Sequence, residues 1–274
     1  MAKSKFVASV LKSLDLLQAI NERDGMTAFE VAKLVGVPRP TAYRLLETLE
    51  EAGLIIRGPS DDGWHLTVKV KRLSSGFRDE LGIAQCAVPA MRSLGRQILW
   101  PLDLSTFENY SMVVRESTHA TSPFSLDLGM VGRGVPLLLT AAGRAYLAFC
   151  PASERKAILA ALARFPGDEF SLAREPQALN QILSRVQETG LGFRHNLFKP
   201  HTQSISAPIM VGERVLACLT IIWISSAISF EEANEKFRGP LLETTKQIVA
   251  TFEEKYMSPG NSRSGYIADI SSSA

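Results

Sequence analysis

TAFEVAKLVGVPRPTAYRLLETLEEA, residues 27–52, has the pattern of two short amphipathic helices separated by Gly36. Ala32 lies four residues before Gly36, and a glycine can adopt the positive φ that a tight turn between two crossing helices requires. The stretch therefore predicts a helix-turn-helix, whose second helix would enter the major groove of DNA. An ordinary helical hairpin inside a core is the alternative. The residues expected to be buried are Val31, Ala32, Val35, Ala42, Leu45, Leu46 and Leu49.

The flanking sequence extends this pattern to a winged helix-turn-helix. Thr27 and Glu30 have the spacing of a capping box, and Pro38 and Pro40 bracket the start of the second helix. A helix is expected over residues 7–21, and short strands are expected over 54–57 and 64–67, around a turn-rich tip. We predict a DNA-binding domain over residues 1–68 and a linker helix over 69–82, with Val70, Leu73 and Phe77 at helical spacing. The stripe expected to pack the first helix on a small core is Val10, Leu11, Leu14, Leu17 and Ile20.

The remainder alternates between helical and strand patterns, and its strands come as adjacent pairs. Strands are expected over 102–107, 111–117, 203–210 and 215–224, and helices over 83–99, 140–149, 153–163, 176–189 and 229–256. Short turns within each pair imply antiparallel pairing. The predicted fold class is therefore α+β, with a second domain over 83–257 and a disordered Ser/Gly-rich tail over 258–274.

Composition indicates a globular protein of 274 residues, with 46% hydrophobic and 21% charged residues. We expect no transmembrane span and no signal peptide, and we expect a cytoplasmic location. Cys86, Cys150 and Cys218 are widely spaced in apolar surroundings and are expected to be reduced core residues. The net charge is +2, and the first 80 residues carry 12 Lys/Arg against 11 Asp/Glu. Binding of DNA would therefore need local positive charge and a dimer that doubles the phosphate contacts.

With its elements in this order, the chain up to about residue 257 resembles the IclR family of bacterial transcription regulators. The specific matches are VGVPRPTAYRLLETLEEAGLI (35–55), VGRGVPLLLTAAGRAYLAF (131–149) and SISAPI (204–209). Three other stretches look similar to the members that activate 3-(3-hydroxyphenyl)propionate catabolism: 59–80, 100–119 and 165–176. The resemblance implies a homodimer or tetramer whose GAF-like C-terminal domain binds an aromatic acid. It also implies that this effector alters engagement of operator DNA or RNA polymerase, as in an activator.

The predicted DNA contacts lie on the exposed face of the second helix and around it. Arg39, Thr41 and Tyr43 lie near the helix N-terminus and can reach base edges, and Arg44 can bind guanine or phosphate. Asp61 and Asp62 at the wing tip would repel phosphate. The full set of predicted DNA-binding residues is Thr27, Arg39, Pro40, Thr41, Tyr43, Arg44, Thr48, Arg57 and His65.

Catalytic and metal motifs are absent from the sequence, which lacks G-x-S-x-G, C-x-x-C, H-E-x-x-H, G-x-G-x-x-G and P-loop patterns. The four histidines are scattered, so we predict neither an enzyme, nor a metal site, nor a cofactor. A pocket that binds without reacting fits better.

Residues for such a pocket are carried over from the resemblance, which places the ligand between the sheet and residues 130–141. Many relatives have an acidic residue near 194 and a cysteine near 204, where this chain has Arg194 and Ser204. An arginine there could bind a carboxylate bidentately, although Arg115, Arg133, Lys199 and His201 are also available. The full set of predicted effector residues is Met130, Leu138, Arg194, His195, Ser204, Ser206, Thr220 and Ile222.

Three alternatives stay open at this point. The chain could be a repressor of this family that responds to a different small organic acid. It could be a ligand-binding protein or an enzyme that does not bind DNA. The helix-turn-helix could also serve protein contact, which the near-neutral charge of the first 80 residues would suit.

Overall fold

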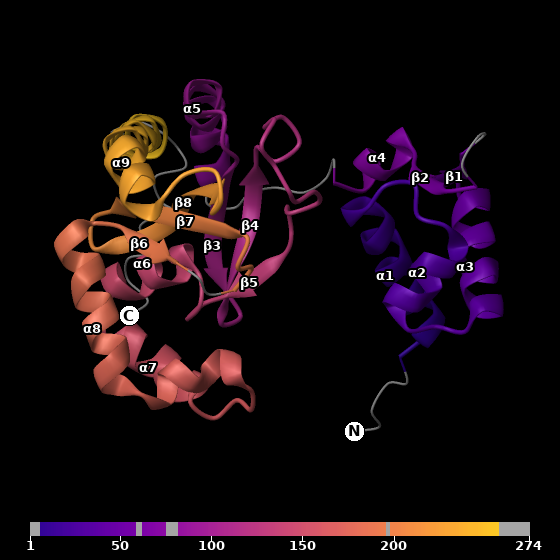
Figure 1. The fold of residues 1–274 in the computed structure, drawn as a ribbon, viewed down its shortest axis with the longest axis horizontal. Helices are drawn as coiled ribbons and strands as arrows, with labels where there is room; N and C mark the ends of the chain where they lie inside the picture. Colours follow the sequence, from indigo (N-terminus) through magenta and orange to yellow (C-terminus); the bar gives the residue numbers. More distant parts are fainter. Residues whose placement is uncertain (1–5, 59–61, 75–81, 196–197, 258–274) are drawn as a thin grey trace. The chain divides into compact units, whose positions relative to one another are not determined.

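The computed structural model describes residues 6–58, 62–74, 82–195 and 198–257. It contains two compact units (Figure 1). Unit 1 comprises Met1–Arg78 together with Asp127–Met130, and unit 2 comprises Asp79–Leu126 and Val131–Ala274. The predicted disordered tail, residues 59–61 of the predicted wing tip and part of the predicted linker helix, including Phe77, lie outside the described residues.

Unit 1 has the element order of a winged helix-turn-helix. Its elements are α1 (Ala8–Glu22), α2 (Ala28–Val35), α3 (Arg39–Glu51), β1 (Ile55–Arg57), β2 (Trp64–Leu66), a 3-10 turn (Val68–Val70) and α4 (Lys71–Ser74). The two strands pair antiparallel, with Ile56 opposite His65. The predicted order of three helices and a hairpin is confirmed.

The ends of α2 are fixed by its own sequence. The Thr27 hydroxyl accepts a hydrogen bond from the Glu30 amide, and the Glu30 carboxylate accepts one from the Thr27 amide at 2.9 Å. At the other end Gly36 has φ 68°, the left-handed conformation that glycine adopts without strain. Both signals predicted from sequence are therefore present, and they bring α3 across α2.

The core of unit 1 forms where all three helices meet the hairpin, and the prediction for α1 was partly wrong. Leu16, Ala19 and Ile20 of α1 are buried there, together with Leu46 of α3 and Trp64 of β2. In contrast, the predicted core residues Val10, Leu11 and Leu14 are 56%, 51% and 50% exposed. The reason is that α1 is longer than the small core it covers, so only its C-terminal turns pack.

Unit 2 is built on a six-stranded antiparallel sheet in the order β5-β4-β3-β8-β7-β6. The strands are β3 (Leu102–Glu108), β4 (Ser111–Ser117), β5 (Gly134–Pro136), β6 (Gly192–Arg194), β7 (Thr202–Val211) and β8 (Arg214–Ile224). The helices are α5 (Ile83–Ile98), α6 (Ala141–Phe149), α7 (Ala152–Leu162), α8 (Pro176–Thr189) and α9 (Phe230–Tyr256), and a 3-10 segment spans Asp168–Arg174.

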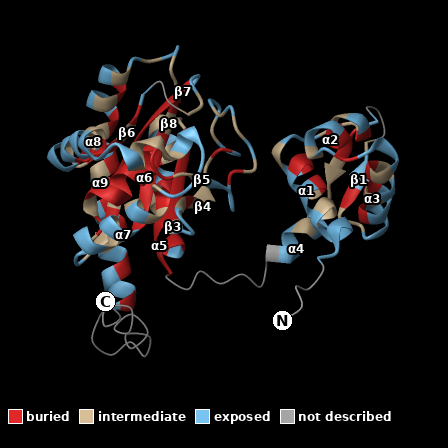
Figure 2. Ribbon diagram, turned by 90° about the horizontal axis from the view of Figure 1, so that it is seen from below, coloured by how far each residue is buried: buried red, intermediate tan, exposed pale blue. Residues whose placement is uncertain are grey.

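Helices cover both faces of this sheet, as Figures 1 and 2 show. Leu104, Ile205 and Ile221 point to the face of α5 and α9 and form the larger core with Phe237 of α9. On the opposite face α6 is buried along almost its whole length and packs with α8 around Leu147. The α+β class is therefore confirmed, with an antiparallel sheet and helices on both sides.

The sequence missed β5 and β6, which are three-residue strands at the two edges of the sheet. A strand that short carries too few residues for an alternating pattern to be visible. The four longer strands were located to within two residues. No helix among the described residues is long and apolar enough to cross a membrane.

The three cysteines are free and buried. Burial, reinforced by the nearby Glu154, raises the pKa of the Cys150 thiol to about 11. Burial also raises the pKa of Cys218. Both side chains are therefore neutral thiols at pH 7 and act as small apolar residues in the core under α6, as expected.

Candidate functional site

The first candidate site is the solvent face of α3. Ala42, Leu46 and Leu49 point into the core of unit 1. The residues predicted to contact DNA lie on the other side: Arg39, Pro40, Arg44 and Thr48 are exposed, and Thr41 and Tyr43 are partly exposed. The helix thus presents two arginines, a tyrosine and two threonines on one exposed surface. Such a surface can contact phosphates and base edges.

Arg39 is oriented by two aromatic rings. Its guanidinium carbon lies 5.6 Å from the centroid of the Tyr43 ring and 6.0 Å from that of Phe29, and one guanidinium nitrogen lies 3.5 Å from the Tyr43 hydroxyl. Phe29 is 58% exposed on α2 and lies outside the buried stripe of that helix, so helical periodicity alone did not point to it. The available signal was a large apolar residue, Phe29, on the side of α2 that is expected to face solvent.

Arg44 and Thr48 differ in how free their polar groups are. The Arg44 guanidinium is exposed and has no hydrogen-bond partner among the described residues. The Thr48 hydroxyl donates to the Arg44 carbonyl at 2.7 Å, one helical turn earlier. Arg44 is therefore available to a ligand, whereas Thr48 can contribute only as an acceptor unless that bond breaks.

The two wing residues predicted to contact DNA are held by other parts of unit 1. The Arg57 guanidinium lies 4.9 Å from the centroid of the Trp64 ring. His65 Nδ1 lies 2.9 Å from Asp24 Oδ1, which ties the hairpin to the connection between α1 and α2. Both remain accessible enough to contact a DNA backbone, and that role stays a prediction.

Thr27 has a structural role that competes with its predicted phosphate contact. Its hydroxyl donates to Glu30 Oε2 at 2.9 Å and accepts from the Glu30 amide, and the Glu30 carboxylate sits at the N-terminus of α2. These hydrogen bonds from Thr27 lower the pKa of Glu30. A phosphate at this position would meet a carboxylate, so the structure favours capping over DNA contact.

We expect Thr27→Ala to destabilise α2 by about 1 kcal/mol, because an N-cap hydroxyl is lost, without weakening DNA binding by the folded protein. Hydrogen exchange of the α2 amides and a gel-shift titration measure the two effects, and Thr27→Ser is the matched control. If the folded Thr27→Ala variant bound DNA more weakly than the wild type, the result would support the predicted phosphate contact of Thr27.

The pKa of Glu30 in the folded protein lies below its ordinary value of 4.5. The stabilisation from the capping box is therefore complete above pH 4.5, and it is lost as the pH falls through the folded pKa.

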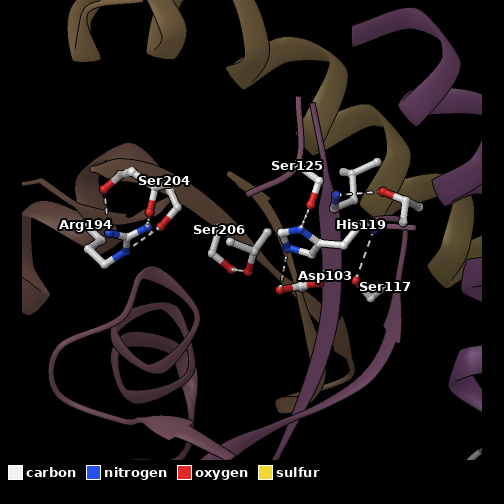
Figure 3. Close-up of polar contacts among 11 residues, drawn as sticks. Asp103, Ser117, His119, Ser125, Arg194, Ser204 and Ser206 are labelled. Atoms are coloured by element: carbon white, nitrogen blue, oxygen red, sulfur yellow. Dashed lines mark hydrogen bonds and ion pairs between the residues drawn. The ribbon is translucent and has the colours of Figure 1, made fainter. Parts of the chain in front are cut away.

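The second candidate site is the polar part of the sheet face that α6 covers in unit 2. Ser206 pairs with Thr220, and Ser204 pairs with Ile222. The Ser206 and Thr220 hydroxyl oxygens lie 2.9 Å apart, and Ser206 also donates to the Leu219 carbonyl at 3.2 Å. Because their neighbours in sequence face α9, these residues share the α6 side of the sheet. Three buried hydroxyl groups there form a polar patch (Figure 3).

Arg194 lies at the β6 end of this patch, and its hydrogen bonds go to the protein itself. The side chain is 4% exposed, and its Nε donates to Ser204 Oγ at 3.2 Å. Its Nη1 lies 2.6–3.0 Å from the carbonyl oxygens of Phe198, Lys199 and Thr202, and its Nη2 donates to Thr202 Oγ1 at 2.9 Å. Phe198 and Lys199 have positive φ values of 36° and 62°. The guanidinium therefore holds a strained turn, and a carboxylate could use it only by displacing these acceptors.

The other predicted effector residues are dispersed. His195 is exposed and stacks on the Phe230 ring, with centroids 5.3 Å apart. Leu138 is buried in the core under α6, and Met130 belongs to the segment that groups with unit 1. Ile222, half-buried, is beside Ser204. The structure thus brings Arg194, Ser204, Ser206, Thr220 and Ile222 together on one face of the sheet, whereas His195 stacks on Phe230 of α9.

Two polar residues missed from sequence lie beside or under the patch. Asp103 of β3 pairs directly with Thr220, and its carboxylate lies 3.6 Å from Nε2 of the buried His119 (Figure 3). Arg144 of α6 is 2% exposed and donates to the carbonyls of Leu138 and Phe193. Burial lowers the pKa of Arg144 to about 10. The signal for each was present: Asp103 alternates with buried leucines, and Arg144 interrupts an apolar helix.

Comparison with known proteins identifies both parts of the chain. The family model "IclR helix-turn-helix domain" matches residues 9–59, and "Bacterial transcriptional regulator IclR C-terminal" matches residues 77–250. The HTH-type transcriptional regulator KipR of Bacillus subtilis is 25% identical over 89% of this chain and 98% of its own length. The HTH-type transcriptional regulator KdgR of Escherichia coli is 26% identical over 74% of this chain and 76% of its own length.

Solved structures show the same fold at low sequence identity. The IclR protein of Thermotoga maritima superposes with a TM-score of 0.63 at 19% identity, covering 90% of this chain and 99% of its own. An IclR homolog from Microbacterium hydrocarbonoxydans, complexed with 4-hydroxybenzoate, superposes with a TM-score of 0.61 at 18% identity and the same coverage.

Proposed function

The chain belongs to the IclR family of bacterial transcriptional regulators, and we propose that it activates an aromatic-acid catabolic operon in the cytoplasm. Its family and its relatives are DNA-binding transcriptional regulators, and this chain is likewise a DNA-binding regulator and not an enzyme. In this proposal a small aromatic carboxylate, such as 3-(3-hydroxyphenyl)propionate, binds unit 2 and changes how the protein engages its operator or RNA polymerase. The activator role and this effector follow from the resemblance of residues 59–80, 100–119 and 165–176.

The polar patch under α6 is the observation that carries the effector proposal. Ser204, Ser206 and Thr220 place three buried hydroxyls on the sheet face under α6, with the buried Arg194 at one end. All three hydroxyls take part in hydrogen bonds within the protein, and because a hydroxyl can both donate and accept, the patch can also serve a polar ligand. The M. hydrocarbonoxydans homolog is complexed with 4-hydroxybenzoate, an aromatic acid of the proposed class.

The exposed apolar stripe of α1 supports a homodimer. Val10, Leu11 and Leu14 follow a helical period on α1 and are each at least half exposed, and the exposed Phe6 and Val7 directly precede the helix. A contiguous apolar surface of this kind usually marks a protein interface. A second copy of the chain would cover the stripe, and the resulting dimer would place two α3 helices on two half-sites. A tetramer would pair two such dimers.

Footprinting and calorimetry together test the proposal. We expect the protein to protect two half-sites in the DNA flanking its own gene, separated by about one helical turn or a multiple of it. Titration with 3-(3-hydroxyphenyl)propionate should release heat, and this ligand should alter the footprint or the transcript level. Thr220→Val should weaken binding of this ligand about tenfold, because the substitution removes a hydroxyl from the patch.

The matched control is Thr245→Val, because Thr245 is also buried but its hydroxyl donates to the Leu242 carbonyl within α9. It should bind the ligand as the wild type does. Flat heats across a set of phenolic acids, with the footprint intact, would leave a regulator with another effector. A fall in transcript level on adding a ligand that binds would indicate a ligand-dependent repressor instead of an activator.

A further inference from the structure

Two buried polar atoms on strand β3 have no hydrogen-bond partner among the described residues: Asp103 Oδ1 and Ser105 Oγ. Asp103 is 7% exposed and Ser105 is 2% exposed. A buried carboxylate oxygen without a donor carries a desolvation penalty. Such a pair in a native core calls for a physical explanation, and a bound ligand group would supply the missing hydrogen bonds.

Both atoms belong to the α6 side of the sheet, next to the polar patch. Asp103 and Ser105 alternate with Leu102 and Leu104, which point to the α9 side. Asp103 is in register with Thr220, whose other neighbour is Ser206 on β7. Figure 3 shows Asp103 next to Ser206, with Arg194 and Ser204 farther along the same face.

His119 lies near one oxygen of the Asp103 carboxylate, Oδ2, whereas the other oxygen, Oδ1, has no partner among the described residues. Its Nε2 lies 3.6 Å from Asp103 Oδ2, and its Nδ1 lies 2.6 Å from Ser125 Oγ. The His119 amide also donates to Ser117 Oγ at 3.3 Å. The imidazole is therefore held by Ser125 beside Asp103 Oδ2, and His119 acts as a positioning residue for this carboxylate.

We propose that Asp103 and Ser105 bind the hydroxyl group of an aromatic hydroxy acid, at the end of the effector opposite its carboxylate. This inference depends on the effector class proposed above. A carboxylate accepts hydrogen bonds and a serine hydroxyl both donates and accepts. A phenolic hydroxyl can thus donate to Asp103 Oδ1 and accept from Ser105. The effector carboxylate is repelled by Asp103 and is attracted to the Arg194 end.

The spacing of the sheet fits a ligand of this kind. Ser204 and Asp103 are two strands apart and two residues out of register. At ~4.8 Å per strand and ~3.4 Å per residue, their Cα atoms are therefore about 12 Å apart. With a hydrogen bond of about 3 Å at each end, the polar groups of the ligand would be roughly 6–9 Å apart. A phenol that carries a short acid side chain has this length.

The test compares 3-(3-hydroxyphenyl)propionate with 3-phenylpropionate, which lacks the hydroxyl, by calorimetry on the full chain. The wild type should bind the hydroxylated ligand about tenfold to a hundredfold more tightly. Asp103→Asn should reduce this preference to less than about fivefold, with the affinity for 3-phenylpropionate nearly unchanged. Ser105→Ala should also reduce the preference for the hydroxylated ligand. Because this substitution removes little volume, it provides a second test if Asp103→Asn folds poorly.

Gln203→Met is the matched control. Gln203 Oε1 is also buried without a partner among the described residues, but Gln203 pairs with Trp223, which faces the α9 side. This variant should keep the wild-type preference. An equal preference in the wild type, Asp103→Asn and Ser105→Ala, with clear binding, would overturn the assignment and leave the effector class standing. No binding of either ligand by the wild type would overturn both.

Discussion

Replacing Gly192 by alanine is expected to destabilise unit 2 by more than about 3 kcal/mol. A Cβ at this position would lie 2.0 Å from the Ala141 carbonyl oxygen and 2.7 Å from the Ala145 amide nitrogen. Both atoms are backbone atoms of α6 or its N-terminal turn, so no side-chain rotation can relieve the overlap. The helix would have to move off β6, where Arg144 binds the Phe193 carbonyl.

The effect should appear as a fall of roughly 10 °C in the thermal unfolding midpoint of unit 2 and as a loss of effector binding. Gly95→Ala is the matched control, because its Cβ would meet the Leu102 side chain at 3.4 Å and it lies within α5. That change should alter stability by less than about 1 kcal/mol, or increase it. Unfolding midpoints that are equal for the two variants would show that α6 does not pack on β6 as closely as described.

The second large effect is expected for Arg44→Ala in operator binding. An arginine that contacts a guanine contributes about 1–3 kcal/mol, which is roughly a 5- to 150-fold change in affinity per protomer. The proposed homodimer would use the residue twice, so the expected change for the complete operator approaches the square of that factor. Arg44 is the strongest candidate because its guanidinium is exposed and is not bonded to any described residue.

Gel-shift titration on operator and on unrelated DNA separates the possible contacts. Loss of affinity for the operator alone indicates base recognition, whereas equal loss on both DNAs with a smaller salt dependence indicates a phosphate contact. Arg92→Ala removes the same charge from an exposed position on α5 of unit 2 and should leave both affinities close to the wild type. If folded Arg44→Ala bound the operator as well as Arg92→Ala does, Arg44 would be removed from the interface.

Local sequence signals located nearly every helix and long strand of this protein. The capping box of Thr27 and Glu30 and the positive φ of Gly36 are properties of a few neighbouring residues, so they could be predicted without the rest of the fold. The alternation of Ser204 and Ser206 is likewise a local property, which gives both residues the same face of β7. Short edge strands and the exposed half of α1 could not be predicted, because they depend on where the sheet and the core end.

The candidate sites show the same division more sharply. Helical periodicity predicted which side of α3 faces solvent, and the resemblance directed attention to Arg194, Ser204 and Thr220. It did not reveal that the Arg194 guanidinium is bonded to the turn at Phe198 and Lys199. Partners of that kind come from other segments of the chain, and no single-residue pattern records them.

The sequence by itself determined the helix-turn-helix of residues 27–52, the antiparallel strand pairs and the family, because these depend on local spacing and on contiguous motifs. Only the tertiary structure decided which residues meet across strands. The register of β3 against β8 places Asp103 beside Thr220, and the length of α1 relative to its core leaves Leu14 exposed. A periodic sequence specifies which face a side chain occupies, whereas strand register and helix packing determine what lies opposite it.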